Sequence, residues 1–263
     1  MPVFNINGLE IGGDQFFENI TLTFGYFRGA QYYLLRVARE KLNGDKQYPF
    51  VLAPNGAGGA TTSALGLSAI KPYPLIINAG LFNNGQGQSK DPVGKVIEDS
   101  TAIKDVTTSF PPLTIDNNGD LYYDDGTTSC ADLIASGVVS AVSGFGPIII
   151  NYQPTSQESY IYPDRWNEDS QRQVIGQFGN GDYGILTIEG RTFDHSTGLG
   201  LGDVQALCQQ YNFKFAYNLD GGGSTETVYG KKQINIIYEG TTGRICPTFI
   251  VFNGTDTFGD PEE

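Results

Sequence analysis

Short apolar segments separated by polar and glycine-rich turns dominate this chain. Apolar runs of about four to eight residues bounded by turn residues are typical of β-strands. They predict strands at 31–38, 75–77, 113–116, 121–123, 138–142, 148–150, 174–178, 183–188, 213–217, 233–238 and 248–252. Two of the connections, 117–120 and 179–182, contain the Asn, Gly and Asp residues that favour tight hairpin turns.

A helical period occurs in only two places. Residues 201–211 repeat apolar side chains at Leu201, Val204, Leu207 and Cys208, which predicts a helix with one buried face. A second helix is expected to end at Ile70, with Thr61 or Thr62 as its N-cap. Many strands and few helices indicate a single α+β domain with a curved mixed β-sheet. We expect residues 30–263 to form this domain and residues 1–29 to pack on it or extend from it.

Composition agrees with this fold and limits the partners. The chain has 263 residues with 35 Gly, 13 Pro and 17% charged residues, which favours turns and short strands. A net charge of −13 repels phosphate backbones and anionic membranes, so no nucleic-acid partner is expected. No run approaches the roughly 20 apolar residues of a membrane-spanning helix, so no membrane insertion is expected.

The start of the sequence shows neither the basic nor the apolar region of a signal peptide. A cytoplasmic protein, a phage virion component, or a chain from which a leader has been removed is therefore expected. The sequence leaves open whether the protein forms a homo-oligomer or is part of a virion assembly.

Cysteine and histidine are scarce. Cys130, Cys208 and Cys246 are widely spaced, and buried thiols are the expected state. The single histidine, His195, excludes a histidine-rich metal site. It is a candidate general acid or base at the rim of a site, and the alternative is a loop histidine with no role.

The densest chemistry lies at residues 218–226, Asn-Leu-Asp-Gly-Gly-Gly-Ser-Thr-Glu, directly after an apolar strand. Three consecutive glycines suit a backbone that takes positive φ or lies against a ligand. Other polar residues also stand at strand ends: Asn78, Arg172 and Arg191. Active sites favour such positions because a rigid sheet aims the side chains. A solvated glycine turn with Asp220 as a cap is the alternative.

The order of these segments resembles the phosphodiester glycosidase family, which includes the mannose-6-phosphate uncovering enzyme and exopolysaccharide-related bacterial and phage proteins. The resemblance covers roughly residues 30 to 252. The segments that carry it are 78–82, 94–97, 144–147, 172–176, 189–191 and 218–224. Leu81, where the family often has a small residue, and the polar and aromatic segment 153–169, expected as a long lid-like loop, depart from the family pattern.

The resemblance implies hydrolysis of a sugar 1-phosphodiester at the glycosidic carbon, in a phosphorylated glycan or a wall or capsule polymer. Asp220 would act as base or nucleophile, with Arg172 and Arg191 on the phosphate oxygens. Backbone N–H groups of Gly221, Gly222, Gly223 and Ser224 could form an anion-binding nest. Asn78 and Asn218 would orient sugar hydroxyls or water. Lys90 is a further candidate for substrate binding.

Three questions stay open at this stage. The same cleft could bind a glycan without cleaving it, or serve a phage tail component, and the aromatic residues Tyr160, Tyr162 and Trp166 suit sugar stacking in each case. No cofactor is expected, although Asn218, Asp220 and Glu226 offer oxygen ligands to a hard cation such as Ca²⁺. Glu226 itself is expected on the solvated surface, outside the site.

Overall fold

The structure, a computed structural model, describes residues 4–6, 9–11, 19–40, 48–71, 73–85, 90–191, 196–237 and 243–252. It confirms an α+β fold with few helices. The described α-helices are α1 (Ala64–Ile70), α2 (Cys130–Ala135) and α3 (Leu201–Gln210). None of the helices in these ranges is long and apolar enough to cross a membrane. A small hairpin of β1 (Phe4–Ile6) and β2 (Leu9–Ile11) lies near the N-terminus.

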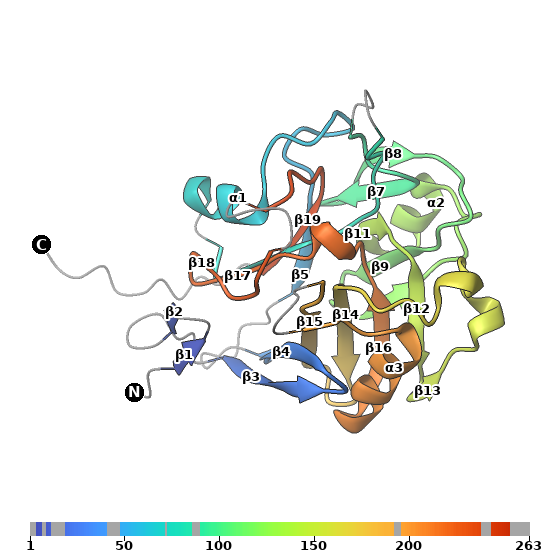
Figure 1. Cartoon of the computed structure of the whole chain (residues 1–263). Coiled ribbons are helices and arrows are strands. Elements are labelled where there is room, and N and C mark those ends of the chain that lie inside the picture. The colour runs from blue at the N-terminus through green and yellow to red at the C-terminus, as the bar shows by residue number, and fades with distance from the viewer. Residues whose placement is uncertain are drawn as a thin grey trace, which may run out of the picture.

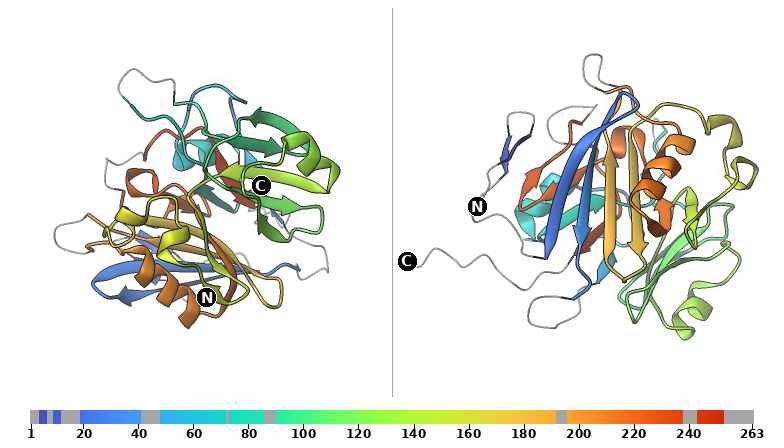
Figure 2. Two further views of the ribbon diagram at one scale, coloured as in Figure 1. Left: turned by 90° about the vertical axis from the view of Figure 1, so that its right-hand side faces the viewer. Right: turned by 90° about the horizontal axis from the view of Figure 1, so that it is seen from below.

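The largest sheet has seven strands and carries α3 on one face (Figure 2). In spatial order its strands are β13 (Gln153–Pro154), β12 (Gly146–Ile150), β16 (Phe213–Asn218), β14 (Arg172–Phe178), β15 (Tyr183–Ile188), β4 (Ala30–Val37) and β3 (Ile20–Phe27). The hairpin expected over 179–182 joins β14 to β15. The apolar face predicted for α3 packs on this sheet, because Leu201, Val204, Leu207 and Cys208 are all buried there.

In the described part of the chain, two five-stranded sheets complete the fold. The first, in spatial order, contains β10 (Leu121–Tyr123), β9 (Pro112–Asp116), β11 (Val138–Ser143), β7 (Lys95–Glu98) and β8 (Thr101–Asp105). The second contains β18 (Lys232–Gln233), β17 (Thr227–Tyr229), β6 (Leu75–Asn78), β19 (Phe249–Phe252) and β5 (Pro49–Leu52).

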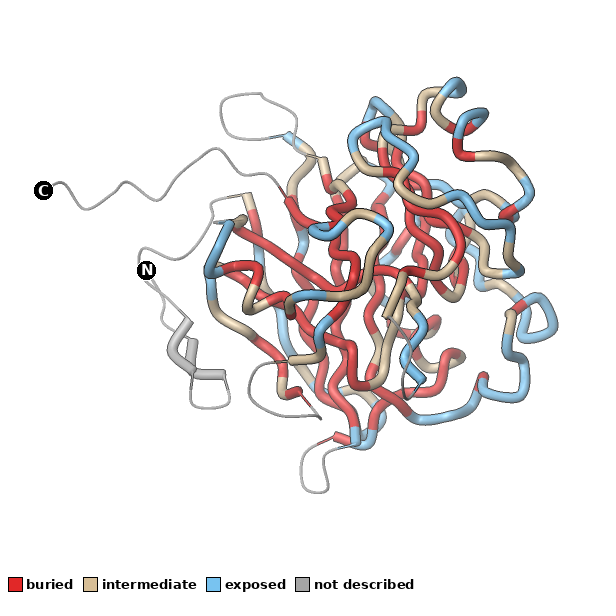
Figure 3. Tube along the Cα trace, turned by 90° about the horizontal axis from the view of Figure 1, so that it is seen from above, coloured by how far each residue is buried: buried red, intermediate tan, exposed pale blue. Residues whose placement is uncertain are grey.

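Every strand pair in the described residues is antiparallel, where the sequence analysis expected one curved mixed sheet. Short hairpins join many consecutive strands, and such connections produce antiparallel neighbours. The main core lies where the three sheets face one another. It combines side chains such as Leu35, Ile77, Leu113, Ile175 and Tyr217. Figure 3 shows this buried interior under a partly exposed layer of loops.

Two element boundaries differ from the sequence prediction. Ser63, not Thr61 or Thr62, caps α1, because its side chain accepts a hydrogen bond from the Gly66 N–H. The strand expected at 233–238 is limited to β18, and Tyr238 lies outside the described residues. The Asn235 side chain explains this: it accepts from the Thr227 N–H and donates to the Thr225 carbonyl, so it replaces backbone pairing.

The strand ends predicted to carry polar side chains meet in space. The start of β14 lies beside the ends of β15 and β16, since Arg172 pairs with Ile188 and Val174 with Asn218. The end of β6 joins this group through a hydrogen bond from the Asp220 N–H to the Ala79 carbonyl. The polar strand ends therefore lie at the junction between the seven-stranded sheet and the β6 sheet.

Candidate active site

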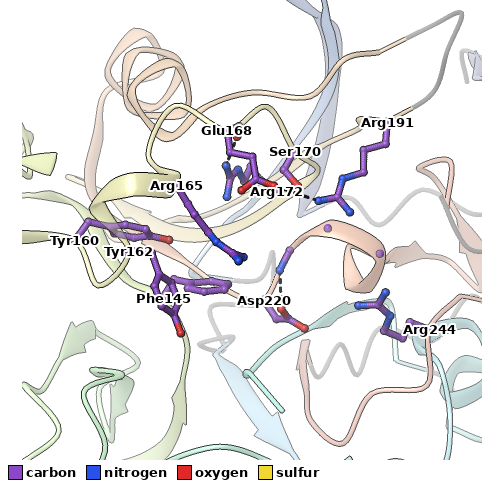
Figure 4. A pocket seen from close by; sticks show the side chains of 13 residues that line it. Phe145, Tyr160, Tyr162, Arg165, Glu168, Ser170, Arg172, Arg191, Asp220 and Arg244 are labelled. Atoms are coloured by element: carbon purple, nitrogen blue, oxygen red, sulfur yellow. Dashed lines mark hydrogen bonds and ion pairs between the residues drawn. The ribbon is translucent and has the colours of Figure 1, made fainter. Parts of the chain in front are cut away.

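Asp220 lies at the centre of this junction and is held by its main chain. Its N–H donates to the Ala79 carbonyl at 3.0 Å, and its carbonyl accepts from Asn78 Nδ2 at 2.7 Å. The preceding Leu219 is fully buried in the main core. With the backbone fixed on both sides, the carboxylate is directed into a cleft (Figure 4).

The glycine run after Asp220 turns tightly through the short helix η4 (Gly222–Ser224). A Cβ on Gly221 would lie 2.8 Å from the Gln171 carbonyl oxygen, and Gly222 has φ +58°. Both positions therefore require glycine, the first for close approach and the second for left-handed backbone. The run brings the chain against the start of β14.

Most backbone amides of this run already donate hydrogen bonds within the protein, so they do not form the anion nest expected from the sequence. The Gly221 N–H donates to Asp220 Oδ1, the Gly222 N–H to the Gln171 carbonyl and the Ser224 N–H to the Gly221 carbonyl. Within the described residues, Gly223 alone of these four has no such acceptor. Glycines 221–223 line the cleft, but three of the four amides expected to form an anion nest already have acceptors within the protein.

Arg172 lies in the wall of the cleft and is partly buried. Its Nε donates to the Leu199 carbonyl at 3.0 Å and its Nη2 to the Glu168 carbonyl at 2.5 Å. Burial lowers its pKa and the neighbouring Arg191 acts in the same direction, while Tyr160 and the carboxylates of Glu168 and Asp169 oppose this shift. Its described hydrogen bonds go to neutral carbonyls, so the positive charge is not neutralised by them and donors remain on a guanidinium that has five.

Arg191 approaches the same space from the end of β15. It has φ +60°, an unusual backbone conformation for a residue with a side chain, and such strain is concentrated at functional sites. Its Nη2 lies 3.6 Å from Glu168 Oε1. Arg172, Arg191 and Asp220, which the sequence analysis selected together, therefore line one cleft.

Asn78 and Asn218 support the cleft from behind, where the sequence analysis expected them to touch the substrate. Each is 1% exposed. Asn78 bridges two segments, because its Oδ1 accepts from the Glu226 N–H while its Nδ2 holds Asp220. Asn218 Nδ2 donates to the Tyr160 hydroxyl at 2.9 Å. Ser224 is also buried and accepts a hydrogen bond from Arg244 Nη1 at 3.1 Å.

The complete cleft has a volume of about 210 Å³. Aromatic side chains and arginines dominate its walls. The lining residues are Phe145, Tyr160, Tyr162, Arg165, Glu168, Ser170, Arg172, Arg191, Asp220, Gly221, Gly222, Gly223 and Arg244. The segment 153–169, expected as a lid-like loop, supplies four of these residues.

Arg165 and Arg244 were not selected from the sequence. Arg244 follows a glycine, as Arg191 does, and this repeated Gly-Arg pair is the signal that could have identified it. Arg165 stands in a polar segment with no such signal. Of the three aromatic residues expected to stack on sugar, Tyr160 and Tyr162 line the cleft, while Trp166 is 6% exposed and packs against Tyr160 in the core beside α3.

The environment of Asp220 raises the pKa of its carboxyl to about 6. Burial among surrounding protein atoms is the main cause, and a hydrogen bond from Ser224, the charge of Arg244 and the Gly221 N–H oppose it. The group is therefore ionised at neutral pH and protonated in mild acid. A carboxyl with such a pKa can exchange protons within the physiological range.

Glu226 is buried, which contradicts the expectation of a solvated surface residue. Its side chain is turned away from the cleft to the start of α1, where it accepts the N–H groups of Ala64 and Leu65 at 2.9 and 3.0 Å. Burial raises the pKa of Glu226 to about 7, opposed by these two hydrogen bonds. Its role in this structure is to join α1 to β17.

The remaining candidates do not join the described cleft. Lys90 is described but is not among the lining residues, and His195 lies outside the described residues. The three oxygen donors considered for a hard cation do not converge, because Asn218 bonds to Tyr160 and Glu226 to α1. Within the described ranges, no three His, Cys, Asp or Glu side chains gather as metal ligands. Cys130, Cys208 and Cys246 are buried free thiols, as predicted.

Comparison with known proteins relates residues 73–253, more than half of the chain, to the phosphodiester glycosidase family. The SPbeta prophage-derived uncharacterized protein YomE of Bacillus subtilis (strain 168) is 29% identical over 139 residues. That alignment covers 50% of this chain and 21% of the relative. The chain therefore matches only about a fifth of that longer protein.

Solved structures share the fold at low sequence identity. The catalytic domain of zebrafish N-acetylglucosamine-1-phosphodiester alpha-N-acetylglucosaminidase, auto-inhibited by its pro-peptide, has a TM-score of 0.69 at 17% identity, with 90% of this chain and 82% of that chain covered. A hypothetical protein from Synechocystis has a TM-score of 0.66 at 14% identity, covering 96% of this chain and 64% of that one. A putative exported protein from Burkholderia pseudomallei K96243 has a TM-score of 0.65 at 12% identity, covering 85% and 74%.

Proposed function

Because the chain belongs to the phosphodiester glycosidase family, we propose that it hydrolyses the glycosidic bond of a sugar 1-phosphodiester and releases a sugar and a phosphate monoester. One observation carries the proposal. Arg172, Arg191 and Asp220, from three separate strand ends, line a single cleft. This reaction needs cations that bind the phosphate, and it needs a carboxylate that acts at the anomeric carbon.

Arg172 is suited to bind the phosphate. A guanidinium binds phosphate oxygens through paired N–H groups in a fixed plane. The hydrogen bonds to the Leu199 and Glu168 carbonyls fix the plane of Arg172 without neutralising its charge. Arg191, which lines the same cleft, would contact a further oxygen of the same phosphate.

The reaction then depends on charge stabilisation more than on acid catalysis. Ordinary glycosidases pair a general acid with a second carboxylate, because an alcohol is a poor leaving group. A phosphate monoester is a good one. The bond between the anomeric carbon and the phosphate oxygen breaks, the electron pair leaves with the phosphate, and the arginines stabilise the added charge.

Asp220 would supply the attack on the anomeric carbon. With a pKa of about 6 it is ionised at neutral pH. It either removes a proton from the water that forms the new C–O bond, or forms that bond itself before water replaces it. Phe145 and Tyr162, on the wall of the cleft, offer an apolar surface for the sugar ring.

The Asp220→Asn variant tests this assignment. Asparagine keeps the oxygen that accepts the Gly221 N–H, so the fold should be retained while turnover falls at least about 100-fold, as is typical for loss of an acid–base group. The assay measures release of N-acetylglucosamine from its ethyl 1-phosphodiester, with Asp99→Asn at an exposed hairpin turn as the matched control. Full activity of Asp220→Asn would refute the catalytic role. Tight binding without turnover by the wild type would favour a non-catalytic glycan-binding module.

The Bacillus relative supports a second part of the proposal. That protein is prophage-derived, which favours a phage-encoded enzyme or virion component that acts on a phosphorylated polymer of the host surface. Incubation with a purified teichoic acid whose repeats are joined by sugar 1-phosphodiesters should then expose phosphate monoester ends, from which a phosphatase liberates inorganic phosphate for assay. Absence of release, combined with turnover of the small phosphodiester, would limit the function to small substrates.

A further inference from the structure

Segment 153–169 forms a fixed wall of the cleft. Its two short helices are η2 (Gln157–Ser159) and η3 (Pro163–Arg165). Tyr160 and Trp166 are 7% and 6% exposed and pack edge to face with ring centres 5.4 Å apart. The Trp166 carbonyl also accepts the Leu201 N–H at the start of α3, at 2.7 Å. The segment is therefore anchored to the domain on both sides of η3.

Arg165 stands between these two anchors and extends into the cleft (Figure 4). The residue is exposed, and its guanidinium carbon lies 5.8 Å from the centre of the Tyr162 ring. Among the described residues it has no carboxylate partner within 4 Å, in a chain whose net charge is −13. The anchors on both sides fix the backbone that carries this cation, and its guanidinium donors can meet an anionic group in the cleft.

The charge of the simplest substrate does not account for Arg165. A phosphodiester carries one negative charge, and Arg172 and Arg191, which line the same cleft, already supply the guanidinium groups proposed for its oxygens. Arg165 reaches the cleft from a different segment and lies beside the aromatic wall. Its position and charge point to a second anionic group on the molecule that the cleft binds.

We propose that Arg165 recognises a second anionic group of the substrate, so that the preferred substrates are glycosyl phosphodiesters that carry a further phosphate or carboxylate. A repeat unit of a polyanionic glycan has this chemistry. The second charge could belong to the sugar or to the aglycone. The inference rests on the proposed function, and it makes Arg165 a determinant of specificity for the reaction at Asp220.

The test compares three probes with the same reacting bond. They are the ethyl 1-phosphodiester of N-acetylglucosamine, the same compound with a 6-phosphate on the sugar, and the 1-phosphodiester to glycerol 3-phosphate. The wild type should favour one of the two probes with a second anionic group by roughly 10-fold or more in kcat/KM, as expected for a charged hydrogen bond. The probe that is favoured identifies which side of the bond carries the second anion.

Arg165→Gln should remove most of this preference, and Arg165→Lys should retain part of it. Lys214→Gln removes one positive charge at the opposite end of β16 from Asp220 and should keep the preference. Equal kcat/KM for the three probes in the wild type, or an unchanged preference in Arg165→Gln, would overturn the inference while leaving the proposed function intact.

If the wild type hydrolyses none of the probes, the proposed function fails, and binding still tests the role of Arg165. Calorimetric titration with the same three compounds should then give a tighter Kd for one of the probes with a second anionic group, and Arg165→Gln should lose that difference. Equal Kd values for all probes would overturn the inference on this route as well.

Discussion

At the scale of single residues, Asp220 is set between opposing influences. Burial raises the pKa of its carboxyl to about 6, whereas the Arg244 charge and hydrogen bonds from Ser224 and the Gly221 N–H lower it. The ionised form is the one that can accept a proton or attack carbon. Activity should therefore increase with pH across the range in which Asp220 loses its proton.

The kcat/KM for a sugar 1-phosphodiester should rise with an apparent pKa of about 6. Arg244→Gln removes a charge that favours the ionised carboxylate, so the rising limb should move to higher pH. A pH–rate profile of both proteins measures this, with Arg36→Gln, in the ion pair with Asp182, as the control. A limb that stays in place in Arg244→Gln would contradict this account of the Asp220 pKa.

At the scale of elements, the cleft is assembled by side chains that join one segment to the next. Asn78 links β6 to the glycine run and to Glu226, and Glu226 links β17 to α1. Asn218 links β16 to the segment 153–169 through the Tyr160 hydroxyl. These buried amides and carboxylates hold the lining residues in register, since a buried polar group is costly to leave without a partner.

Tyr160→Phe tests one of these links. Loss of the hydroxyl removes the acceptor of Asn218 Nδ2, and the Asn218 Oδ1 already has no partner in the described part of the chain. A buried polar group left unpaired costs about 1–3 kcal/mol, so the free energy of unfolding should fall by that amount. KM should also rise, because the wall that holds Tyr162 and Arg165 loses an anchor.

Urea unfolding and steady-state kinetics give both quantities. Tyr211→Phe is the matched control, since it removes a hydroxyl that bonds to Tyr32 outside the cleft. The control should leave KM unchanged. An equal KM in Tyr160→Phe and wild type would show that Asn218 does not position the segment.

At the scale of the whole molecule, charge is distributed unevenly. The chain has a net charge of −13, yet arginines 165, 172, 191 and 244 gather in one cleft with Asp220. The acidic surface has a cost, because like charges repel in the compact state. Burial raises the pKa of Asp220 to about 6 and that of Glu226 to about 7, so ionising these two carboxyls also lowers the stability of the folded state.

Stability should therefore increase when the pH is lowered from 7 to about 5. Asp220 and Glu226 hold protons in the folded state that they release when unfolded, so the free energy of unfolding falls as the pH rises through that window. Asp105 and Asp182 have lowered pKa values, the first through its hydrogen bond to Lys95. The stability that these two ionised carboxylates contribute is lost below about pH 4. The free energy of unfolding should therefore be greatest near pH 5.

Thermal unfolding between pH 4 and pH 8 measures this curve. The Asp220→Asn and Glu226→Gln double variant cannot titrate at these two positions, so its change in Tm between pH 7 and pH 5 should be smaller. A Tm that falls steadily from pH 7 to pH 5 in the wild type would contradict the prediction.

Much of the fold was predictable from the sequence because the signals are local. Short apolar runs bounded by turn residues identified the strands of both predicted hairpins, and a single helical period identified the buried face of α3. Strand pairing could not be predicted from these signals. One mixed sheet was expected, whereas the described residues form three antiparallel sheets and a separate hairpin. Pairing depends on contacts between distant segments, and a period along one strand does not specify its neighbour.

For the candidate site, the sequence by itself determined the residue types at strand ends: Asp220, Arg172 and Arg191, with Gly222, whose positive φ is a local requirement of the turn. Only the tertiary structure decided which side chains face the cleft. It turned Glu226 to α1, placed Asn78 and Asn218 behind the wall, and added Arg165 and Arg244. The physical reason is that burial and charge at one point are the sum of contributions from segments far apart in the chain, and no short run of sequence contains that sum.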